Sequence, residues 1–255
     1  MGFRNLSHEV ETEYRGLKIH AASNLHRSCL SAIDKLQLPP KASALDLGAG
    51  EGAFSQRLLE KGYQVVAVEL DRARFKLPIP HYSLDLNLDF SDRIAQRFDL
   101  VVAIEIIEHL SSTRHFIANC LRLLKPDGVL LLTTPNLESW LSRIKFIREG
   151  RFLWFEEEDY RSYGHITPVF SWQIAQVCQE NNAEIINVSS TDKRFLREKL
   201  GHGLLEVLRN KALYMSVLRP LMNGRKNGEI GIYTIRKRPE AQSSPVPKLL
   251  QMKSR

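Results

Sequence analysis

Short apolar runs alternate with amphipathic segments through the middle of the chain. Each run is rich in Val, Leu and Ile and lies between turn-forming residues, which predicts a strand buried on both faces. Between the runs, apolar residues recur at helical spacing, which predicts helices with one buried face. The expected strands are 43–47, 64–69, 81–84, 99–104, 129–134, 184–190 and 229–238, and the expected helices are 53–61, 112–124 and 171–181.

This alternation is typical of βαβ units. Such units stack parallel strands into one sheet and place helices on both of its faces. A Pro-Asp-Gly sequence at 126–128 predicts a turn before the fifth strand. We therefore expect an α/β fold with a seven-stranded, mostly parallel sheet.

Four segments lie outside this alternation and have other sequence patterns. Apolar positions near the start follow helical spacing and stop at a Pro-Pro pair, which predicts a helical cap. A long aromatic-rich stretch without a regular pattern indicates a lid over a site. A later stretch with nine Lys or Arg against three Asp or Glu predicts a basic helical insertion. We expect one domain at 1–238, with a cap (1–40), a cofactor-binding core (41–135), an aromatic lid (136–170) and the basic insertion (192–226), followed by a disordered tail (239–255).

Composition narrows the class of protein. With 255 residues and 43% hydrophobic content, the chain can bury the core of one domain. The opening residues hold no apolar leader, and no run of about 18 uncharged apolar residues occurs, so we expect a cytoplasmic protein. Cys29, Cys120 and Cys178 lie far apart without a CxxC pair, which fits core residues in a reducing compartment and argues against a structural zinc site. The net charge of +7 allows anionic partners without choosing among them.

The stretch "ALDLGAGEGAF" at 44–54 places three glycines between an expected strand and an expected helix. Glycines at such a turn let a ligand approach the backbone closely. Glu69 lies nineteen residues after Gly50, at the end of the next strand, where an acidic side chain can bind both hydroxyls of a ribose. Leu70 and Asp71 follow Glu69 directly, so a shift of one position would change which side chain lies at the ribose. The pairing favours an adenosine-type ligand.

Two classes of adenosine ligand fit this loop. "GAGEGA" satisfies the G-x-G-x-x-A fingerprint of NAD and FAD sites, so spacing alone does not exclude a dinucleotide. Charge separates the two classes, because Asp46 and Glu51 would repel a pyrophosphate. The sulfonium and ammonium groups of S-adenosylmethionine are instead attracted by carboxylates. We therefore expect the methyl donor rather than a dinucleotide.

Four segments, in this order, resemble a known family. "LDLGAGEG", "VVAVELD", "FDLVVAIEIIEHL" and "LKPDGVLLLTTPN", within residues 40–136, are similar to motifs of the class I S-adenosylmethionine-dependent methyltransferases. The E-x-x-E-H after the fourth strand resembles the branch that includes ubiquinone-pathway O-methyltransferases and small-RNA 3′-end methyltransferases. The resemblance implies a Rossmann-like fold whose seven-stranded, mostly parallel sheet has an antiparallel last strand, with helices on both faces.

The resemblance also implies roles for individual residues at the donor site. The glycines would pack against the methionine part of the donor, Asp46 would bind its amino group and Glu69 would bind the ribose hydroxyls. Asp85 would face the adenine amino group and Leu86 would stack on the ring, although Asp85 can also be interpreted as a plain turn residue. The full donor-binding set is Asp46, Gly48, Ala49, Gly50, Gly52, Glu69, Leu70, Asp85, Leu86 and Ile104.

Candidate catalytic residues follow the strand at 99–104. His109 is the leading candidate for a general base, which is needed if the acceptor arrives as a protonated hydroxyl. Glu105, Glu108 and His165 are candidates for binding the acceptor. In the resembling branch a similar E-x-x-E-H set is associated with a divalent metal, so these four residues are also candidate metal ligands. Structural roles for the two glutamates, such as orienting His109, are favoured over the metal.

These patterns favour an S-adenosylmethionine-dependent methyltransferase that acts on an oxygen of a small or lipid-like acceptor. Three other functions stay open: an RNA methyltransferase with metal assistance, an NAD(P)-dependent oxidoreductase, and a module that binds the donor without turnover. The sequence leaves the acceptor and the oligomeric state open. Nucleic acid is not an expected partner because no binding module is recognisable. Basic residues interleaved with Leu, Val and Met at 192–226 allow peripheral membrane contact.

Overall fold

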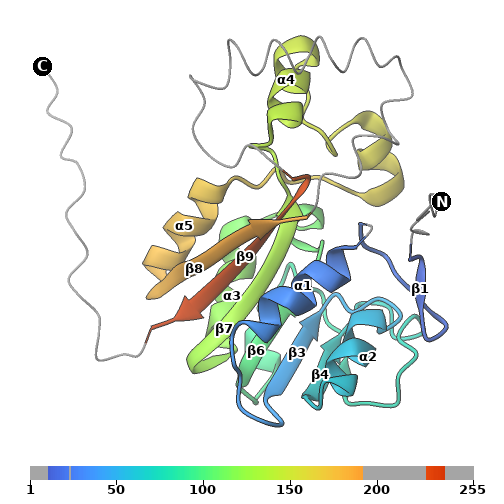
Figure 1. Cartoon of the computed structure of the whole chain (residues 1–255), viewed down its shortest axis with the longest axis vertical. Coiled ribbons are helices and arrows are strands. Elements are labelled where there is room, and N and C mark those ends of the chain that lie inside the picture. The colour runs from blue at the N-terminus through green and yellow to red at the C-terminus, as the bar shows by residue number, and fades with distance from the viewer. Residues whose placement is uncertain (1–10, 23, 192–227, 239–255) are drawn as a thin grey trace, which may run out of the picture.

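The computed structural model describes residues 11–22, 24–191 and 228–238. Its main feature is a seven-stranded sheet of order β5-β4-β3-β6-β7-β9-β8 (Figure 1). Neighbouring strands are parallel, with the exception of β9. This strand is antiparallel to both of its neighbours, β7 and β8. The predicted α/β fold with an antiparallel last strand is confirmed. The strands are β3 (Ser43–Leu47), β4 (Gln64–Val68), β5 (His81–Tyr82), β6 (Phe98–Ala103), β7 (Leu124–Pro135), β8 (Ala183–Ser190) and β9 (Ile230–Lys237).

Helices cover both faces of this sheet (Figure 1). Residues of α1 and α2 join one buried cluster, and residues of α3 and α5 join the other. Strand side chains alternate between the two clusters: Leu45 and Leu47 of β3 pack with α3, whereas Ala44 packs with α2. Because both faces are covered, the strands are apolar at nearly every position. The helices are α1 (Leu25–Asp34), α2 (Ala53–Glu60), α3 (Thr113–Arg122) and α5 (Ser171–Glu180).

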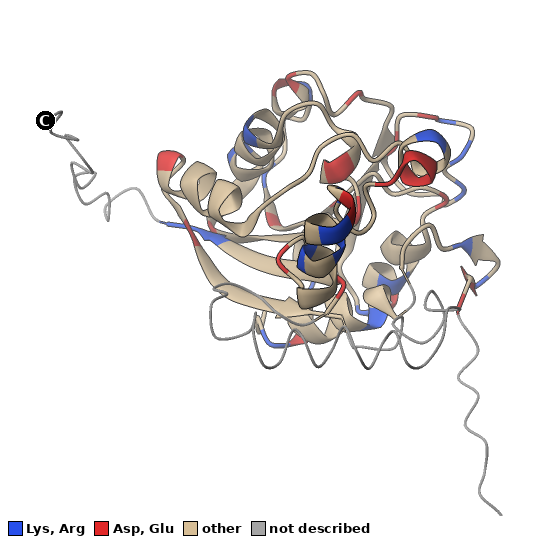
Figure 2. Cartoon of the chain, turned by 90° about the horizontal axis from the view of Figure 1, so that it is seen from above, with Lys and Arg blue, Asp and Glu red and all other residues tan. Residues whose placement is uncertain are grey.

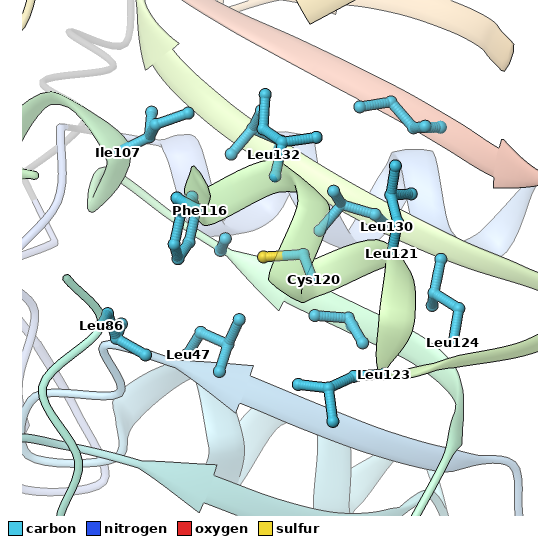
Figure 3. Close-up of a cluster of buried hydrophobic side chains, with 14 of the residues drawn as sticks. Leu47, Leu86, Ile107, Phe116, Cys120, Leu121, Leu123, Leu124, Leu130 and Leu132 are labelled. Atoms are coloured by element: carbon cyan, nitrogen blue, oxygen red, sulfur yellow. The ribbon is translucent and has the colours of Figure 1, made fainter. Parts of the chain in front are cut away.

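The larger cluster centres on α3 (Figure 3). Phe116 and Cys120 of α3 are fully buried and share this cluster with Leu47 of β3 and with Leu130 and Leu132 of β7. Burial of a large apolar side chain of this kind stabilises the fold by roughly 1.5–3 kcal/mol. The expectation that the three cysteines are unpaired core residues is confirmed, since all are free and buried.

Most expected helices and strands are confirmed to within two residues, and the exception among the strands is β7. It begins at Leu124 rather than at residue 129, and it includes the expected Pro-Asp-Gly turn. Leu124 pairs with Phe98 and Val129 pairs with Leu100, so the turn residues form a bulge inside the strand. Asp127 in this bulge has a φ of +61°. Local turn chemistry was therefore interpreted correctly, but it interrupts a strand rather than preceding one.

The helical cap expected over residues 1–40 is wrong in part. Where helix was expected, β1 (Glu13–Tyr14) and β2 (Leu17–Lys18) form an antiparallel hairpin. Arg15 and Gly16 make its turn at φ values of +54° and +75°. Positive φ at both central residues is what a two-residue hairpin turn requires, and glycine favours it. Only α1 is helical in the described part of this segment.

The aromatic stretch at 136–170 is more regular than expected. It contains α4 (Trp140–Glu149) and a π-helical turn, η3 (Asp159–Tyr163). The Ser139 hydroxyl accepts a hydrogen bond from the N–H of Ser142 at 3.2 Å and so caps the start of α4. A glycine in the left-handed region ends the same helix. Both signals are present in the sequence, but the aromatic content obscured them. α4 lies beyond the carboxyl end of β7 (Figure 1).

The basic insertion (192–226) and the tail (239–255) expected from the sequence lie outside the described residues, as do residues 1–10. Over the described elements, acidic and basic residues are interspersed in the view from above (Figure 2). None of the helices in the described part of the chain is long and apolar enough to cross a bilayer.

Candidate functional site

The glycine loop joins the carboxyl end of β3 to the start of α2. Gly48, Gly50 and Gly52 have φ values of +71°, +57° and +99°, a region that side-chain-bearing residues rarely adopt. A Cβ on Gly48 would lie 2.8 Å from Cδ1 of Ile106, and one on Gly52 would lie 2.9 Å from Cδ1 of Leu77. Backbone conformation and close packing therefore both require glycine in this loop.

The N–H groups of residues 48–50 in this loop are paired within the protein. Those of Gly48 and Ala49 donate to the carbonyl oxygen of Val68 at 2.9 and 3.0 Å. That of Gly50 donates to Oε2 of Glu69 at 2.8 Å. A loop that binds a pyrophosphate needs such groups free to face the anion. The N–H groups of these three residues are therefore not available to a pyrophosphate, although the spacing of the loop fits a dinucleotide.

Glu69 follows β4 directly and is 8% exposed. Its Oε1 accepts a hydrogen bond from the N–H of Asp71 at 3.3 Å. Each carboxylate oxygen can accept more than one hydrogen bond, so capacity remains for two ribose hydroxyls. Leu70 is 65% exposed, and its carbonyl accepts from the Ser83 hydroxyl at 2.6 Å. Of the three positions left open by the sequence, Glu69 is the one whose side chain contacts the loop.

Asp46 lies on β3 and is buried. Its Oδ2 accepts a hydrogen bond from the hydroxyl of Ser55 at 2.6 Å. Burial raises the pKa of Asp46 to about 6, so the carboxyl is mostly ionised at pH 7. Holding this charge away from water costs folding free energy. A cationic group of a ligand would offset this cost. Asp46 thus has the electrostatic properties expected for binding an ammonium group.

Glu51 does not supply the negative charge that the sequence suggested for the loop. Its Oε2 accepts a hydrogen bond from the N–H of Lys18 at 2.9 Å and lies 2.7 Å from Nζ of Lys76. The Lys18 N–H, followed by Lys76, lowers the pKa of Glu51. Since the lysine offsets its charge, the electrostatic argument against a pyrophosphate rests on Asp46 and Glu69 instead.

The residues expected to contact adenine differ from one another in their contacts and in their burial. Asp85 Oδ1 accepts hydrogen bonds from the backbone and side-chain N–H groups of Asn87 at 2.9 and 3.1 Å, so Asp85 makes the turn that was the alternative interpretation. Leu86 is buried in the same cluster as Leu47 (Figure 3). Ile104 directly follows β6 and is half-buried. Their contacts with a donor stay predictions.

The E-x-x-E-H segment follows β6 and includes a short 3-10 helix, η2 (Ile107–His109). Among the described residues, Glu108, His109 and His165 offer ligand atoms that lie within 4.8 Å of one another. The two imidazole rings meet edge to face, with centroids 4.9 Å apart. Glu105 is not part of this group, because its Oε2 accepts a hydrogen bond from the N–H of Ala22 at 2.7 Å. The fold therefore brings together three of the four residues.

Both imidazole rings of this group are held by backbone carbonyls. His109 Nδ1 lies 3.3 Å from the carbonyl oxygen of Gly164, and His165 Nδ1 lies 2.7 Å from that of Trp154. A carbonyl oxygen only accepts, so in the neutral form of such a ring Nδ1 carries the proton and Nε2 carries the lone pair. Burial, followed by the neighbouring His165, lowers the pKa of His109. The His109 ring is therefore neutral near pH 7 and able to take a proton.

Glu108 is fully buried, and neither of its carboxyl oxygens has a partner at hydrogen-bond geometry. The hydroxyl of Thr134 lies close to it and is likewise without such a partner. Burial, followed by the charge of Glu105, raises the pKa of Glu108 well above its usual value. A buried carboxyl without a partner beside two imidazole lone pairs fits a divalent metal, which takes N and O ligands. Glu108, His109 and His165 would hold such an ion.

Three contacts at this edge were not expected from the sequence. The Ser55 hydroxyl binds Asp46, Ile106 packs on Gly48, and His20 lies against Gly50, where a Cβ would be 3.4 Å from its Cδ2. Ile106 lies inside the E-x-x-E-H motif, so its position could have been proposed from the sequence. His20 has no local signal, because its place depends on the hairpin that precedes it.

Comparison with known proteins gives three findings. A model of the methyltransferase domain family matches residues 21–188. A ubiquinone biosynthesis O-methyltransferase of Rhodopseudomonas palustris (strain BisB5) is 30% identical over 122 residues, which are 45% of this chain and 44% of that protein. The chain thus spans less than half the length of such curated relatives.

Solved structures show the same fold at low identity. A SAM dependent methyltransferase from Archaeoglobus fulgidus has a TM-score of 0.56 at 16% identity, over 83% of this chain and 92% of that chain. Phosphoethanolamine N-methyltransferase 2 of Haemonchus contortus, in complex with S-adenosyl-L-methionine, has a TM-score of 0.54 at 16% identity, over 84% and 53%. Since the family model covers more than half of the chain, the chain belongs to the methyltransferase domain family and has the Rossmann-like fold of class I S-adenosylmethionine-dependent methyltransferases.

Proposed function

We propose that the protein transfers the methyl group of S-adenosylmethionine to an oxygen of a small or lipid-like acceptor. Membership of the methyltransferase domain family supports methyl transfer. The name of the Rhodopseudomonas palustris relative, an O-methyltransferase, supports oxygen as the target. That relative matches over 44% of its own length, so its acceptor enters here as part of the proposal.

The main support for S-adenosylmethionine as the donor is the hydrogen bonding of the loop N–H groups. Those of residues 48–50 are all bonded within the protein, and the carboxyls of Asp46 and Glu69 are buried beside them. A pyrophosphate would meet occupied donors and two negative charges. A ligand with a sulfonium and an ammonium group gains from the same charges. This supports S-adenosylmethionine over NAD(P).

The two carboxylates have separate roles in this proposal. Asp46 attracts the ammonium group, and Glu69 accepts hydrogen bonds from the ribose hydroxyls. The glycines let the methionine part lie against the backbone. Bound S-adenosylmethionine supplies a methyl group that is activated by the positive charge on sulfur. Most of the rate then comes from residues that hold the acceptor oxygen in line with that methyl group.

His109 is the general base in this proposal. Its Nδ1 is held by the Gly164 carbonyl, so Nε2 can take the proton of an acceptor hydroxyl. The ring of His165, 4.9 Å away, is itself flanked by Phe155 and Tyr163, with centroids 5.7 and 6.0 Å from it. Aromatic rings around His165, the neighbour of the base, suit a planar or lipophilic acceptor. These ring contacts, all made by residues of the 136–170 stretch, support the proposal that this stretch covers the acceptor as a lid.

A metal-assisted form of the same reaction is a second candidate, favoured by the buried carboxyl of Glu108 that lacks a partner. An ion held by Glu108, His109 and His165 would lower the pKa of an acceptor hydroxyl and fix its position. In this form His109 acts as a ligand and not as a base. It is also the form that the RNA alternative would need.

Labelled S-adenosylmethionine, offered with hydroxylated aromatics, lipids, sugars and RNA ends, tests the proposal. We expect label in hydroxylated aromatic or lipid-like acceptors. Activity that survives chelator supports the base role of His109, whereas activity that is lost and then restored by a divalent metal supports the metal-assisted form. Transfer to RNA alone, to nitrogen alone, or to no acceptor while the donor binds would contradict O-methylation of a small acceptor.

A further inference from the structure

Residues 11–22 form an N-terminal strap, made of the hairpin β1-β2, the two residues before it and the four residues after it. Its outer end is fastened to α2. The hydroxyl of Tyr14 donates to the carboxylate of Glu60, and Arg57 pairs with Glu11 at 2.5 Å. The Arg57 guanidinium also lies 3.6 Å from the centre of the Tyr14 ring. Polar contacts therefore fasten the outer end of the strap to α2.

The inner half of the strap follows the glycine loop. The N–H of Lys18 donates to Oε2 of Glu51 at 2.9 Å. Two residues further on, the ring of His20 lies against Gly50. Burial, followed by the charges of Arg74 and Lys18, lowers the pKa of His20, so its ring is neutral beside the loop. This half of the strap covers the part of the protein assigned to the donor.

The inner end of the strap is fastened to Glu105. The N–H of Ala22 donates to Oε2 of Glu105 at 2.7 Å, and the N–H of Glu105 donates to the hydroxyl of Thr133 at 2.9 Å. Glu105 has a φ of +48°, which a non-glycine residue keeps only where its surroundings fix it. The next residue, Ile106, packs on Gly48. Glu105 thus connects the strap to the glycine loop and to the start of the E-x-x-E-H segment.

We propose that the strap closes over the donor and that Glu105 is the positioning residue that holds its inner end. The proposal rests on the donor site at the glycine loop, proposed above. It gives Glu105 a role different from acceptor or metal binding. A backbone N–H needs only an acceptor oxygen, which the amide of glutamine also offers. A metal ligand or a partner for a cation needs the charge of the carboxylate. The two roles therefore respond differently to Glu105→Gln.

Calorimetric titration with S-adenosylhomocysteine and hydrogen exchange of residues 17–22 test the proposal. We expect Glu105→Ala to raise the Kd about tenfold and to speed exchange of these residues, because the acceptor of the Ala22 N–H is lost. Glu105→Gln should stay within about threefold of the wild-type Kd, since the acceptor oxygen is kept. Glu184→Ala is the control, because Glu184 lies on the distant strand β8 and pairs there with Arg238.

Unchanged affinity together with unchanged exchange in Glu105→Ala would overturn the proposal. Equal losses in the alanine and glutamine variants would also overturn it, because they would assign the role to the charge. If Glu105→Ala does not fold, Ala22→Pro removes the same hydrogen bond by deleting the N–H donor. Unchanged affinity together with unchanged exchange in that variant would likewise overturn the proposal. Exchange is also measured without ligand. Failure of the wild-type protein to bind S-adenosylhomocysteine therefore counts against the proposed function and is distinct from failure of the strap.

Discussion

Glu69 and Gly50 are joined by a hydrogen bond of 2.8 Å from the glycine N–H to the carboxylate Oε2. The bond ties the residue after β4 to the loop after β3, its parallel neighbour in the sheet. Ligands of open α/β sheets bind where the carboxyl ends of such strands meet. The fold thus fixes the two parts of the proposed donor site relative to each other.

Glu69→Gln tests the role of this carboxylate. The variant keeps an oxygen that can accept the Gly50 N–H but loses the charge and one acceptor oxygen. We expect the Kd for S-adenosylhomocysteine to rise about tenfold, with little change in melting temperature. Calorimetric titration measures this, with Glu184→Gln as the control. An unchanged Kd would remove Glu69 from the donor site.

Asp46 predicts a dependence of stability on pH. Burial raises its pKa to about 6 from a usual value of about 3.9, so the folded protein holds this proton where the unfolded chain has released it. The free energy of unfolding therefore falls as pH rises between about 4 and 6, by an amount on the order of 3 kcal/mol in total.

Asp46→Asn keeps an oxygen that can accept the hydrogen bond of Ser55 but cannot ionise. We expect this variant to be more stable than the wild type at pH 7 by about 1–3 kcal/mol, with the difference vanishing near pH 4. The same variant should bind S-adenosylhomocysteine more weakly, because the ammonium group loses its counter-charge. Denaturant unfolding at several pH values measures the first effect. A stability difference that is constant over this range would contradict the pKa of Asp46.

Gly48→Ala tests close packing in the loop. A Cβ there would lie 2.8 Å from Ile106, in addition to the cost of a φ of +71°. Gly62→Ala is the matched control, because its φ is +85° and nothing lies within 4 Å of the new Cβ. We expect about 1 kcal/mol of destabilisation at Gly62 and about 2–4 kcal/mol at Gly48. Equal losses in the two variants would show that Ile106 does not constrain the loop.

His109→Asn tests the base. We expect kcat to fall by about 10²- to 10⁴-fold while the Kd for S-adenosylhomocysteine stays nearly unchanged, because the base acts only on the acceptor. His115→Asn is the control, since His115 lies on α3 near the surface with Nε2 on the carbonyl of Leu88. Full activity of His109→Asn with the best acceptor would refute the role.

Glu108→Gln tests the metal fit without reference to activity. Protein treated with a chelator is titrated with Zn²⁺ or Mn²⁺ in a calorimeter. In the metal-assisted form, wild-type protein binds one ion and releases protons, because the carboxyl of Glu108 must ionise. The variant should lose at least about tenfold in affinity, as supporting groups of a metal site already cost that much. Absence of binding to the wild type would remove the metal-assisted form.

The geometry of the proposed donor side was largely predictable, because its sequence signals are local. Glycines at 48, 50 and 52 and an acidic residue after the next strand lie within one βαβ unit, and the parallel sheet brings them together. Glu51 was misjudged for a reason that sequence could not supply. Its charge is offset by Lys76 and by the Lys18 N–H, and the latter comes from a hairpin 33 residues earlier.

The acceptor side was predictable only in part. Glu108, His109 and His165 were proposed as neighbours, and the fold places them together. Glu105 was grouped with them by motif, but its positive φ and its bond to Ala22 separate it from them. Contacts over a separation of 83 residues leave no periodic trace in the sequence. The helix α4 was missed although its caps are local, because aromatic content dominated the interpretation.

Calorimetric titration of the wild-type protein with S-adenosylhomocysteine and, separately, with NAD⁺ tests the central claim most directly. The buried carboxylates and the occupied loop N–H groups predict micromolar or tighter binding of S-adenosylhomocysteine and no measurable heat with NAD⁺. Binding of NAD⁺ without binding of S-adenosylhomocysteine would contradict the account.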